Sequence, residues 1–372
     1  MPDNHTELSV SDSNRPARVT DLDWLHCPNC HELLRKTDEH VSCLPCGEDW
    51  PVIKGVADFT DSTERAEGET FGSYAAVLPE LVEIAERDGW FVALQNVVLP
   101  LPSIGAGLFS YVTDESKGDL VFTLNLCEGQ RVLDLGCGLG SVSVAIARRG
   151  AECYAADVSH EQASFSAIRC RQSGFSNVKA VCAGDDMKLP FGGNYFDAVI
   201  MNGVIEWLGC ADRFPGSPDD AQHAMLGEVH RILRRGGQLY VASKNRYALY
   251  HFLGGAPDHG TKRRWIGMLP LPIQRLRPGG EPDSGARLHG LNGYRRLFRK
   301  SGFVDKAVYA VMPSFRRPKR FVRLDRMSRA ALTGRGGVGL YNRKLERLIS
   351  GLLPASVLRR LVYCYGFVVE KL

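Results

Sequence analysis

A glycine-rich turn between an apolar strand and a helix is the first feature of this sequence that could do chemistry. The apolar strand ends at Leu135, and Gly136, Gly138 and Gly140 follow before a helix expected at 141–149. Glycine lets a backbone approach a ligand where any Cβ would collide, and it tolerates positive φ. Open α/β sheets bind ligands at the carboxyl ends of parallel strands. The pattern predicts a cofactor site, and its spacing differs from that of a dinucleotide fingerprint.

Two C-x2-C pairs near the N-terminus have the spacing of a metal site. Cys27 and Cys30 form the first pair, and Cys43 and Cys46 form the second. Four thiolates can close a tetrahedral zinc site, which leaves no open position for a substrate, so we expect the zinc to be structural. The alternative is two structural or redox-active pairs without metal. We interpret the other cysteines as buried free thiols in a reducing compartment.

From Leu133 to Gly140 the chain resembles the first motif of the class I S-adenosylmethionine-dependent methyltransferases, and further matches follow in order as far as residue 241. The resemblance implies a Rossmann-like α/β fold, a doubly wound, mostly parallel seven-stranded sheet, to which the small N-terminal zinc ribbon is added. It also implies S-adenosyl-L-methionine as the cofactor. The cofactor-binding residues carried over by position are Asp134, Gly136, Cys137, Gly138, Gly140, Asp157, Val158, Asp185, Asp186, Asn202 and Gly203.

The resemblance gives some of these residues individual roles. Asp157 ends a second strand about twenty residues after the glycines, where a carboxylate can accept both ribose hydroxyls. Asp185 accepts from the adenine amino group, and the backbone of Asp186 supports the adenine ring. Asn202 and Gly203 lie at the tip of the fourth strand. We expect residues 302–312 and 365–369 to be the last two strands of the sheet.

The segment after the fifth strand carries a second, narrower resemblance. Together with residues 202–207 and 291–297, it is similar to a subgroup linked with bacterial surface-polysaccharide and glycoconjugate synthesis. A sugar hydroxyl must lose its proton during methyl transfer, so a general base helps. The candidate catalytic residues are His259, Asp258, Glu206 and His251.

Composition and charge set further expectations. Apolar residues make up 44% and charged residues 24% of the 372-residue chain, as in an ordinary soluble protein. The polar N-terminus predicts no signal peptide, and the apolar residues 348–362 are too interrupted to span a bilayer, although they could lie on one. We expect a cytoplasmic protein, with peripheral contact with the inner face of the membrane as an open alternative. The basic run after Arg287 suits phosphates.

The expected organisation has four parts and two excursions. The ribbon is expected to be a separate module, whose loss leaves the cofactor site largely intact. The parts are a disordered N-terminus at 1–20, a zinc ribbon at 21–60, a linker and N-terminal helices over the cofactor at 61–122, and the methyltransferase domain at 123–372, with a lid-like insertion at 243–290 and a basic excursion at 313–347.

These observations predict methyl transfer from S-adenosylmethionine to an oxygen of a sugar-containing or secondary-metabolite acceptor, a small molecule or a glycan. An RNA base is the second choice of acceptor, because residues 50–59 resemble the end of the zinc ribbon found in ribosomal RNA guanine methyltransferases. A third reading is a non-catalytic interaction protein, in which a zinc ribbon is attached to a methyltransferase-like scaffold.

Overall fold

The computed structural model describes residues 24–37, 39–60, 72–210, 214–255, 268, 286–326 and 351–372. His259 and Asp258 lie outside the described residues, as do the N-terminal 1–20 segment, most of the expected lid-like insertion and most of the basic excursion. Among the described residues, no helix combines the length and the apolar character needed to cross a bilayer.

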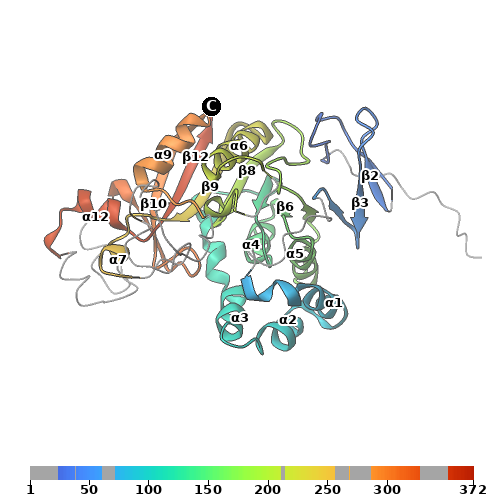
Figure 1. Cartoon of the computed structure of the whole chain (residues 1–372), viewed down its shortest axis with the longest axis horizontal. Coiled ribbons are helices and arrows are strands. Elements are labelled where there is room, and N and C mark those ends of the chain that lie inside the picture. Colours follow the sequence, from blue (N-terminus) through green and yellow to red (C-terminus); the bar gives the residue numbers. More distant parts are fainter. Residues whose placement is uncertain are drawn as a thin grey trace, which may run out of the picture.

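The described residues form a single mixed sheet of twelve strands (Figure 1), in the order β1-β2-β3-β4-β7-β6-β5-β8-β9-β12-β10-β11. The strands are β1 (Arg35–Lys36), β2 (His40–Ser42), β3 (Asp49–Ile53), β4 (Val56–Asp58), β5 (Arg131–Leu135), β6 (Glu152–Asp157), β7 (Val178–Cys182), β8 (Phe196–Asn202), β9 (Leu233–Lys244), β10 (Phe303–Met312), β11 (Arg320–Arg323) and β12 (Cys364–Lys371).

The expectation of seven strands is wrong. The run from β7 to β10 contains seven strands, and β10 and β12 are the last two strands predicted from the sequence. The other five join the two edges of this run. At one edge β4 pairs in parallel with β7, which adds β1 to β4, called here the cysteine-region strands. At the other edge β11 pairs antiparallel with β10. Edge strands present unpaired backbone groups, so they accept further strands without any side-chain signal.

The two faces of the sheet are covered by different helices, because successive strand residues point to opposite faces. Val132 packs with α4 and η4, whereas Leu133 packs with α6, α9 and the cysteine-region strands. A third cluster joins α1, α2 and η3 to α5. The helices are η2 (Gly72–Val77), α1 (Leu78–Asp88), α2 (Trp90–Ala93), η3 (Leu94–Val98), α3 (Gly105–Thr113), η4 (Glu115–Thr123), α4 (Ser141–Arg148), α5 (His160–Gln172), η5 (Ile205–Trp207), α6 (Pro218–Ile232), α7 (Leu249–Phe252), α9 (Leu291–Lys300), η7 (Leu324–Arg326) and α12 (Ala355–Leu361).

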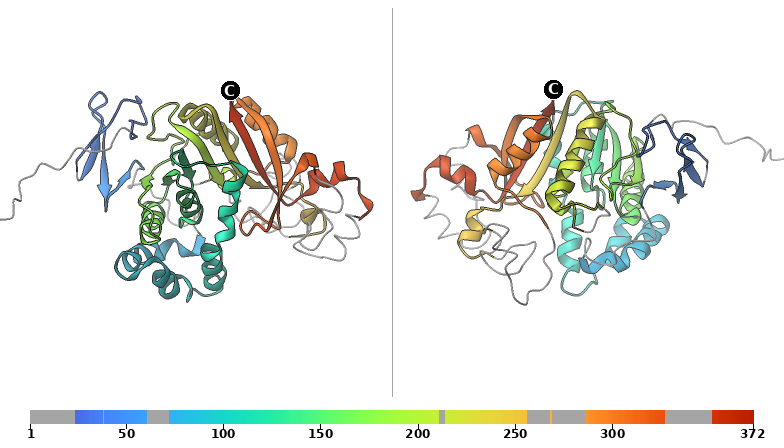
Figure 2. Two further views of the ribbon diagram at one scale, coloured as in Figure 1. Left: turned by 180° about the vertical axis from the view of Figure 1, so that it is seen from behind. Right: turned by 45° about the horizontal axis from the view of Figure 1, so that its top comes forward.

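The cysteine-region strands lie at one end of the molecule, and β11 and α12 lie near the other (Figures 1 and 2). Between them, α1, α2 and α3 gather beside the carboxyl ends of the central strands (Figure 1). The sheet therefore holds the glycine turn after β5 at the centre of the molecule, with helices from the N-terminal part beside it.

Candidate functional site

The turn between β5 and α4 has the backbone conformation that its glycines predict. Gly136, Gly138 and Gly140 have φ angles of 77°, 52° and 79°, which side-chain-bearing residues rarely adopt. A Cβ on Gly136 would collide with the side chain of Val204, and one on Gly140 would meet the Ser166 side chain at 2.9 Å. The turn therefore brings bare backbone against the start of α4, where N–H groups favour an anion.

A cavity of about 240 Å³ opens at this turn. Its walls come from the carboxyl ends of β5, β6 and β8, from the segment after β7, and from helices that precede the sheet. The lining residues include Tyr74, Tyr111, Lys117, Asp134, Gly136, Cys137, Gly138, Asp157, Val158, Gln162, Ala183, Gly184, Asn202, Gly203, Val204, Trp207 and Met225. Eight of the eleven cofactor-binding candidates thus line one cavity. They are Asp134, Gly136, Cys137, Gly138, Asp157, Val158, Asn202 and Gly203.

Asp157 ends β6 and is buried in the cavity wall. Its Oδ2 accepts a hydrogen bond from the Gly138 amide at 2.8 Å, and its Oδ1 accepts one from the Ser159 amide at 3.1 Å. Burial raises the pKa of this carboxyl to about 6, against the opposing effect of the backbone hydrogen bonds. Each oxygen keeps a lone pair with which it can accept a hydroxyl from a ligand.

Asp134 and Lys117 form the charged floor of the same cavity, and both are buried. Burial raises the pKa of Asp134 to about 7, although the Ser143 hydroxyl donates to its Oδ2 at 2.6 Å. Burial lowers the pKa of Lys117 to about 7, and its Nζ lies 3.5 Å from the centre of the Tyr111 ring. The cavity thus offers a buried acid and a buried amine that both titrate near pH 7, a pair that suits the amino and carboxylate groups of an amino-acid ligand.

Lys117, Tyr111 and Tyr74 were not identified from the sequence. They come from η4, α3 and η2, ahead of the first central strand, where the sequence predicts helices over the cofactor but no particular side chain. Tyr74 accepts a hydrogen bond at 3.0 Å from Gln162, another cavity residue on α5. Only the packing of these helices against α4 and α5 brings their polar groups into the cavity, so no local pattern could have found them.

Asp185 and Asp186 follow the two cavity-lining residues Ala183 and Gly184, but neither aspartate is itself a lining residue. Asp186 accepts a hydrogen bond from the Lys188 amide at 3.0 Å, which closes the turn. By contrast, Asn202 lines the cavity and its Oδ1 accepts no hydrogen bond from the described residues. A buried acceptor of this kind favours a ligand that donates to it.

Two candidate catalytic residues are described, and neither lines the cavity. Glu206 is fully buried on η5, beside the lining residue Trp207, and burial raises its pKa. Its Oε2 accepts from the Ser243 hydroxyl at 2.9 Å, whereas its Oε1 has no partner among the described residues. His251 is buried on α7, where its ring lies 6.2 Å from that of Tyr363.

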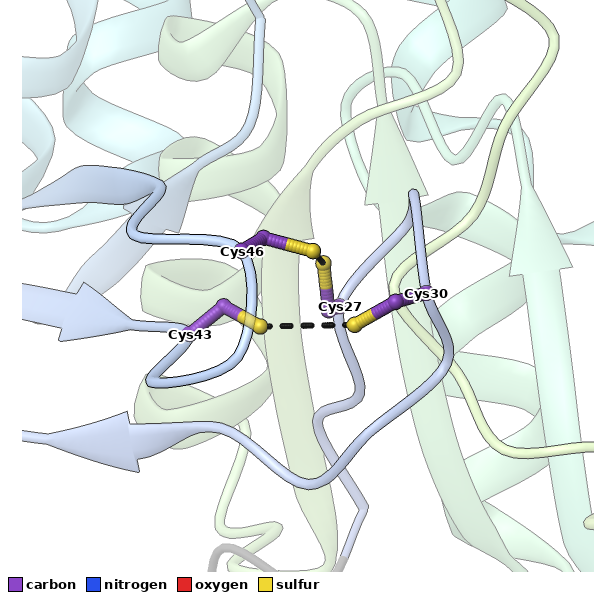
Figure 3. Close-up of side chains that lie close together, drawn as sticks. All are labelled: Cys27, Cys30, Cys43 and Cys46. Carbon is purple, nitrogen blue, oxygen red and sulfur yellow. Dashed lines mark hydrogen bonds between the residues drawn. The ribbon is translucent and has the colours of Figure 1, made fainter.

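The four cysteines of the C-x2-C pairs meet at one point (Figure 3), and their sulfur atoms all lie within 4.8 Å of one another. The Cys27 and Cys46 sulfurs are 3.9 Å apart, and those of Cys30 and Cys43 are 3.4 Å apart. No disulfide joins these cysteines. Tetrahedral Zn²⁺ with Zn–S bonds of about 2.3 Å places sulfurs roughly 3.8 Å apart, which this cluster approaches.

The two cysteine turns have matching backbone hydrogen bonds. The Cys27 amide donates to Glu32 and the Cys43 amide donates to Glu48, both at 2.8 Å. Four residues after each of these cysteines, the amides of His31 and Gly47 donate back to the Cys27 and Cys43 carbonyls at 2.9 Å. Two equivalent turns that face each other present four thiolates to one centre, so the donor set fits a closed metal site.

Comparison with known proteins decides the nature of the central part. Residues 133–241 match a family model described as "Methyltransferase domain". This part of the chain is similar to methyltransferase domains. The matched residues run from β5 to β9, so they include the glycine turn, Asp157 and Asn202, and they leave out the cysteine region and the N-terminal helices.

Two proteins that are similar to this part of the chain have names that refer to quinones. The ubiquinone biosynthesis O-methyltransferase of Agrobacterium fabrum is 32% identical over 32% of this chain, which spans 42% of that protein. The demethylmenaquinone methyltransferase of Geobacillus kaustophilus is 26% identical over 52% of this chain and 78% of its own length. A solved structure of Haemonchus contortus phosphoethanolamine N-methyltransferase 2 covers 78% of this chain and 60% of its own, with 15% identity and a TM-score of 0.43.

The cavity at the glycine turn fits S-adenosylmethionine. Asp157 could accept the ribose hydroxyls. The backbone of Gly138 could contact the ligand, because the position of a Cβ there is open space, with the nearest protein atom 4.0 Å away. Lys117 and Asp134 could pair with the carboxylate and the amino group of the methionine part. The unpartnered Oδ1 of Asn202 is a further acceptor at the same wall.

Proposed function

We propose that this chain is an S-adenosylmethionine-dependent methyltransferase that methylates an oxygen of a small acceptor, a sugar-containing compound or a secondary metabolite. The observation that carries the proposal is the position of Asp157: the β6 carboxylate and the glycine turn after β5 line the same cavity. A strand-end acid beside a bare backbone turn holds a ribose, and a methyltransferase domain matches this same stretch.

When bound, the cofactor supplies a methyl group on a positively charged sulfur, and transfer occurs by in-line displacement. The work of the chain is then to align the acceptor oxygen and to exclude water. Lys117 and Asp134 would hold the methionine part of the cofactor and Asp157 would hold the ribose, while Val204 and Trp207 line the cavity beside them. We propose that the acceptor oxygen approaches from the side of the cavity that these two residues and Asn202 border.

The proton of an acceptor hydroxyl needs a base, and Glu206 is the described candidate that we favour. Its raised pKa, caused first by burial, brings it closer to neutrality, and its Oε1 has no described partner. Because Glu206 does not line the cavity, the proton must reach it through an intervening group or a water molecule. His259, Asp258 and His251 stay as alternative bases.

A small acceptor is supported by the relatives, which include ubiquinone biosynthesis O-methyltransferases and the methyltransferase GfsG of Streptomyces halstedii. These alignments cover about 120 residues. The glycoconjugate subgroup remains our proposal from the sequence.

We further propose that Cys27, Cys30, Cys43 and Cys46 hold one structural Zn²⁺. All four ligands belong to a short segment, and four thiolates complete the coordination shell. An RNA base is the competing acceptor, favoured by this metal ribbon and by its exposed Arg35 and Lys36. The third hypothesis is that this chain is a non-catalytic interaction protein, which binds a partner through a zinc ribbon on a methyltransferase-like scaffold.

Incubation with methyl-labelled S-adenosylmethionine and fractionated cell extract tests the proposal. Label in small molecules or glycans supports it, label in RNA overturns the choice of acceptor, and cofactor binding without any transfer supports the non-catalytic reading. Glu206→Gln should then lower kcat about a hundredfold with unchanged affinity for S-adenosylhomocysteine. If His259→Ala has that effect and Glu206→Gln does not, the base has been assigned wrongly.

A further inference from the structure

The turn between β10 and β11 closes against one wall of the cofactor cavity. Phe315 in this turn is buried, and a Cβ placed on the cavity residue Gly203 would collide with its ring. Glycine at 203 is therefore required for the turn to approach so closely. The contact fixes the β10–β11 turn at the carboxyl end of β8, where Asn202 and Gly203 line the cavity.

The same turn also contacts the start of η4, a second element that contributes to the cavity wall. Arg317 lies beside Asp114, with 3.9 Å between Nε and Oδ2. Asp114 is the N-cap of η4, where its Oδ1 accepts the Ser116 amide at 2.9 Å, and η4 carries the cavity residue Lys117. Arg316 thus lies between two anchored neighbours, of which one touches the β8 wall and the other touches the helix behind Lys117.

The charge of Arg316 is felt inside the cavity. It adds to burial and to Arg169 in lowering the pKa of Lys117, and it opposes the burial that raises the pKa values of Tyr111 and Glu206. Arg316 therefore lies within electrostatic range of the cavity, as the contacts of its neighbours Phe315 and Arg317 also require.

Arg316 has no anion to pair with among the described residues. Its side chain is exposed, and the hydrogen bond recorded for the residue is the one its backbone amide donates to the Ser314 hydroxyl at 3.3 Å. Asp114 is taken by Arg317 and by the η4 amide, and Asp134 and Asp157 are buried deeper in the cavity. Lys319 and Arg320 follow closely, so the turn is strongly basic.

We propose that Arg316 binds a phosphate group of the acceptor, so that the acceptor is a phosphorylated small molecule. This inference rests on the proposed function and names its substrate class. S-adenosylmethionine has one anionic group, the carboxylate, and Lys117 inside the cavity is available for it. The Arg316 guanidinium, in the turn that closes against the cavity wall, is then left for a second anion, and the forked donors of arginine suit phosphate.

The test uses the full-length protein saturated with S-adenosylhomocysteine, so that Lys117 is already engaged, and inorganic pyrophosphate as the probe in calorimetry. Arg316→Gln should weaken pyrophosphate binding about tenfold to a hundredfold. Arg316→Lys should weaken it less, and Arg299→Gln, an exposed change on α9, should leave it unchanged. Succinate in place of pyrophosphate should bind more weakly.

Three outcomes would overturn the inference: no pyrophosphate binding to a protein that does bind S-adenosylhomocysteine, an equal loss in Arg299→Gln, and tighter binding of succinate than of pyrophosphate. All three leave the proposed function standing, because the cofactor analogue still binds. Failure of S-adenosylhomocysteine itself to bind would instead contradict the proposed function. Circular dichroism of each variant checks that the exposed substitutions leave the fold unchanged.

Discussion

The indole of Trp24 stacks on the ring of Phe191, with 6.1 Å between the ring centroids. Trp24 lies just before the first cysteine pair, and Phe191 ends the segment that begins with the cavity residues Ala183 and Gly184. The His26 amide also donates to the Pro190 carbonyl at 3.0 Å, in the same segment. One short segment therefore has the cysteine region on one side and the cofactor cavity on the other.

This contact changes the expectation that the cysteine region is a separate module. Cys27 and Cys43 belong to the same hydrophobic cluster as Leu133 and Met201 of the central strands. The Lys188 ammonium adds a hydrogen bond to Asn29 at 2.7 Å. Loss of order in the metal site should therefore reach residues 183–191, which we treat as the adenine side of the cavity.

The first prediction concerns the metal. Protein purified under reducing conditions should contain about one zinc per chain, and Cys43→Ser should lose it because three thiolates leave the shell open. Metal analysis gives the content, and hydrogen exchange should show faster exchange in residues 24–60 and, because of the shared segment, in 183–191.

Cys127→Ser is the matched control, since Cys127 is an exposed thiol away from the four-sulfur cluster. It should keep the zinc and the exchange pattern of the unmodified protein. If hydrogen exchange in Cys43→Ser is faster only in residues 24–60, the cysteine region is a separate module after all. Absence of zinc from the unmodified protein would contradict the metal site.

The second prediction concerns the Trp24 contact itself. Trp24→Ala removes a buried indole, and large-to-small changes of this kind cost about 3 kcal/mol. Urea denaturation should show a loss of that order, and binding of S-adenosylhomocysteine should weaken because Phe191 loses its partner. Leu33→Ala, in the same region but 53% exposed, should change stability by less than about 0.5 kcal/mol. Equal effects of the two changes would mean that Trp24 contributes no specific packing.

Local patterns were sufficient for the parts of the site that lie within one strand and its turn. The glycine conformations after β5 and the position of Asp157 at the end of β6 follow from residue type and spacing, because only glycine tolerates that turn. The strand count could not be predicted. The pairing of Ala57 with Val181 uses backbone groups, which any residue supplies, so the addition of β4 to β7 leaves no mark in the side chains.

Lys117 is the clearest residue that sequence reasoning could not assign. Its neighbours along the chain give no pattern, and its place in the cavity depends on the packing of η4 against α4. Gly118 permits that packing, because a Cβ there would collide with Ala145. A binding residue of this kind can be identified only from the fold, which brings together two helices that are separate in the sequence.

The third prediction concerns cofactor affinity. Asp157→Ala removes a carboxylate placed to accept two ribose hydroxyls, and charge-assisted hydrogen bonds of this kind contribute about 2–4 kcal/mol together. Calorimetry with S-adenosylhomocysteine should show a loss of roughly thirtyfold to a thousandfold. Asp197→Ala is a suitable control, because Asp197 lies near the start of β8, at the opposite end from the cavity residue Asn202, and pairs with Arg234 at 2.8 Å. Unchanged binding in Asp157→Ala would mean that the ribose lies elsewhere.

The last prediction concerns pH. Burial raises the pKa of Asp157 to about 6 in the cofactor-free protein, and ribose hydroxyls donate to its ionised form. Affinity for S-adenosylhomocysteine should therefore be high above pH 7 and should fall as the pH drops through 6, by up to about tenfold per unit. Asp134, whose buried carboxyl has a pKa of about 7, adds a fall of the same sign if it binds the cofactor amino group. Lys117 adds the opposite one, because its charged form is lost as the pH rises through 7.

Asp157→Asn separates these contributions, because asparagine keeps the shape and does not titrate. Calorimetry between pH 5 and 8 should show that the variant binds more weakly than the unmodified protein at pH 8. The variant should also lose less affinity on acidification, because Asp134 and Lys117 are unchanged in both proteins and only the contribution of Asp157 is missing. Parallel curves for the two proteins would show that another group controls the pH dependence, and would remove Asp157 from the ribose site.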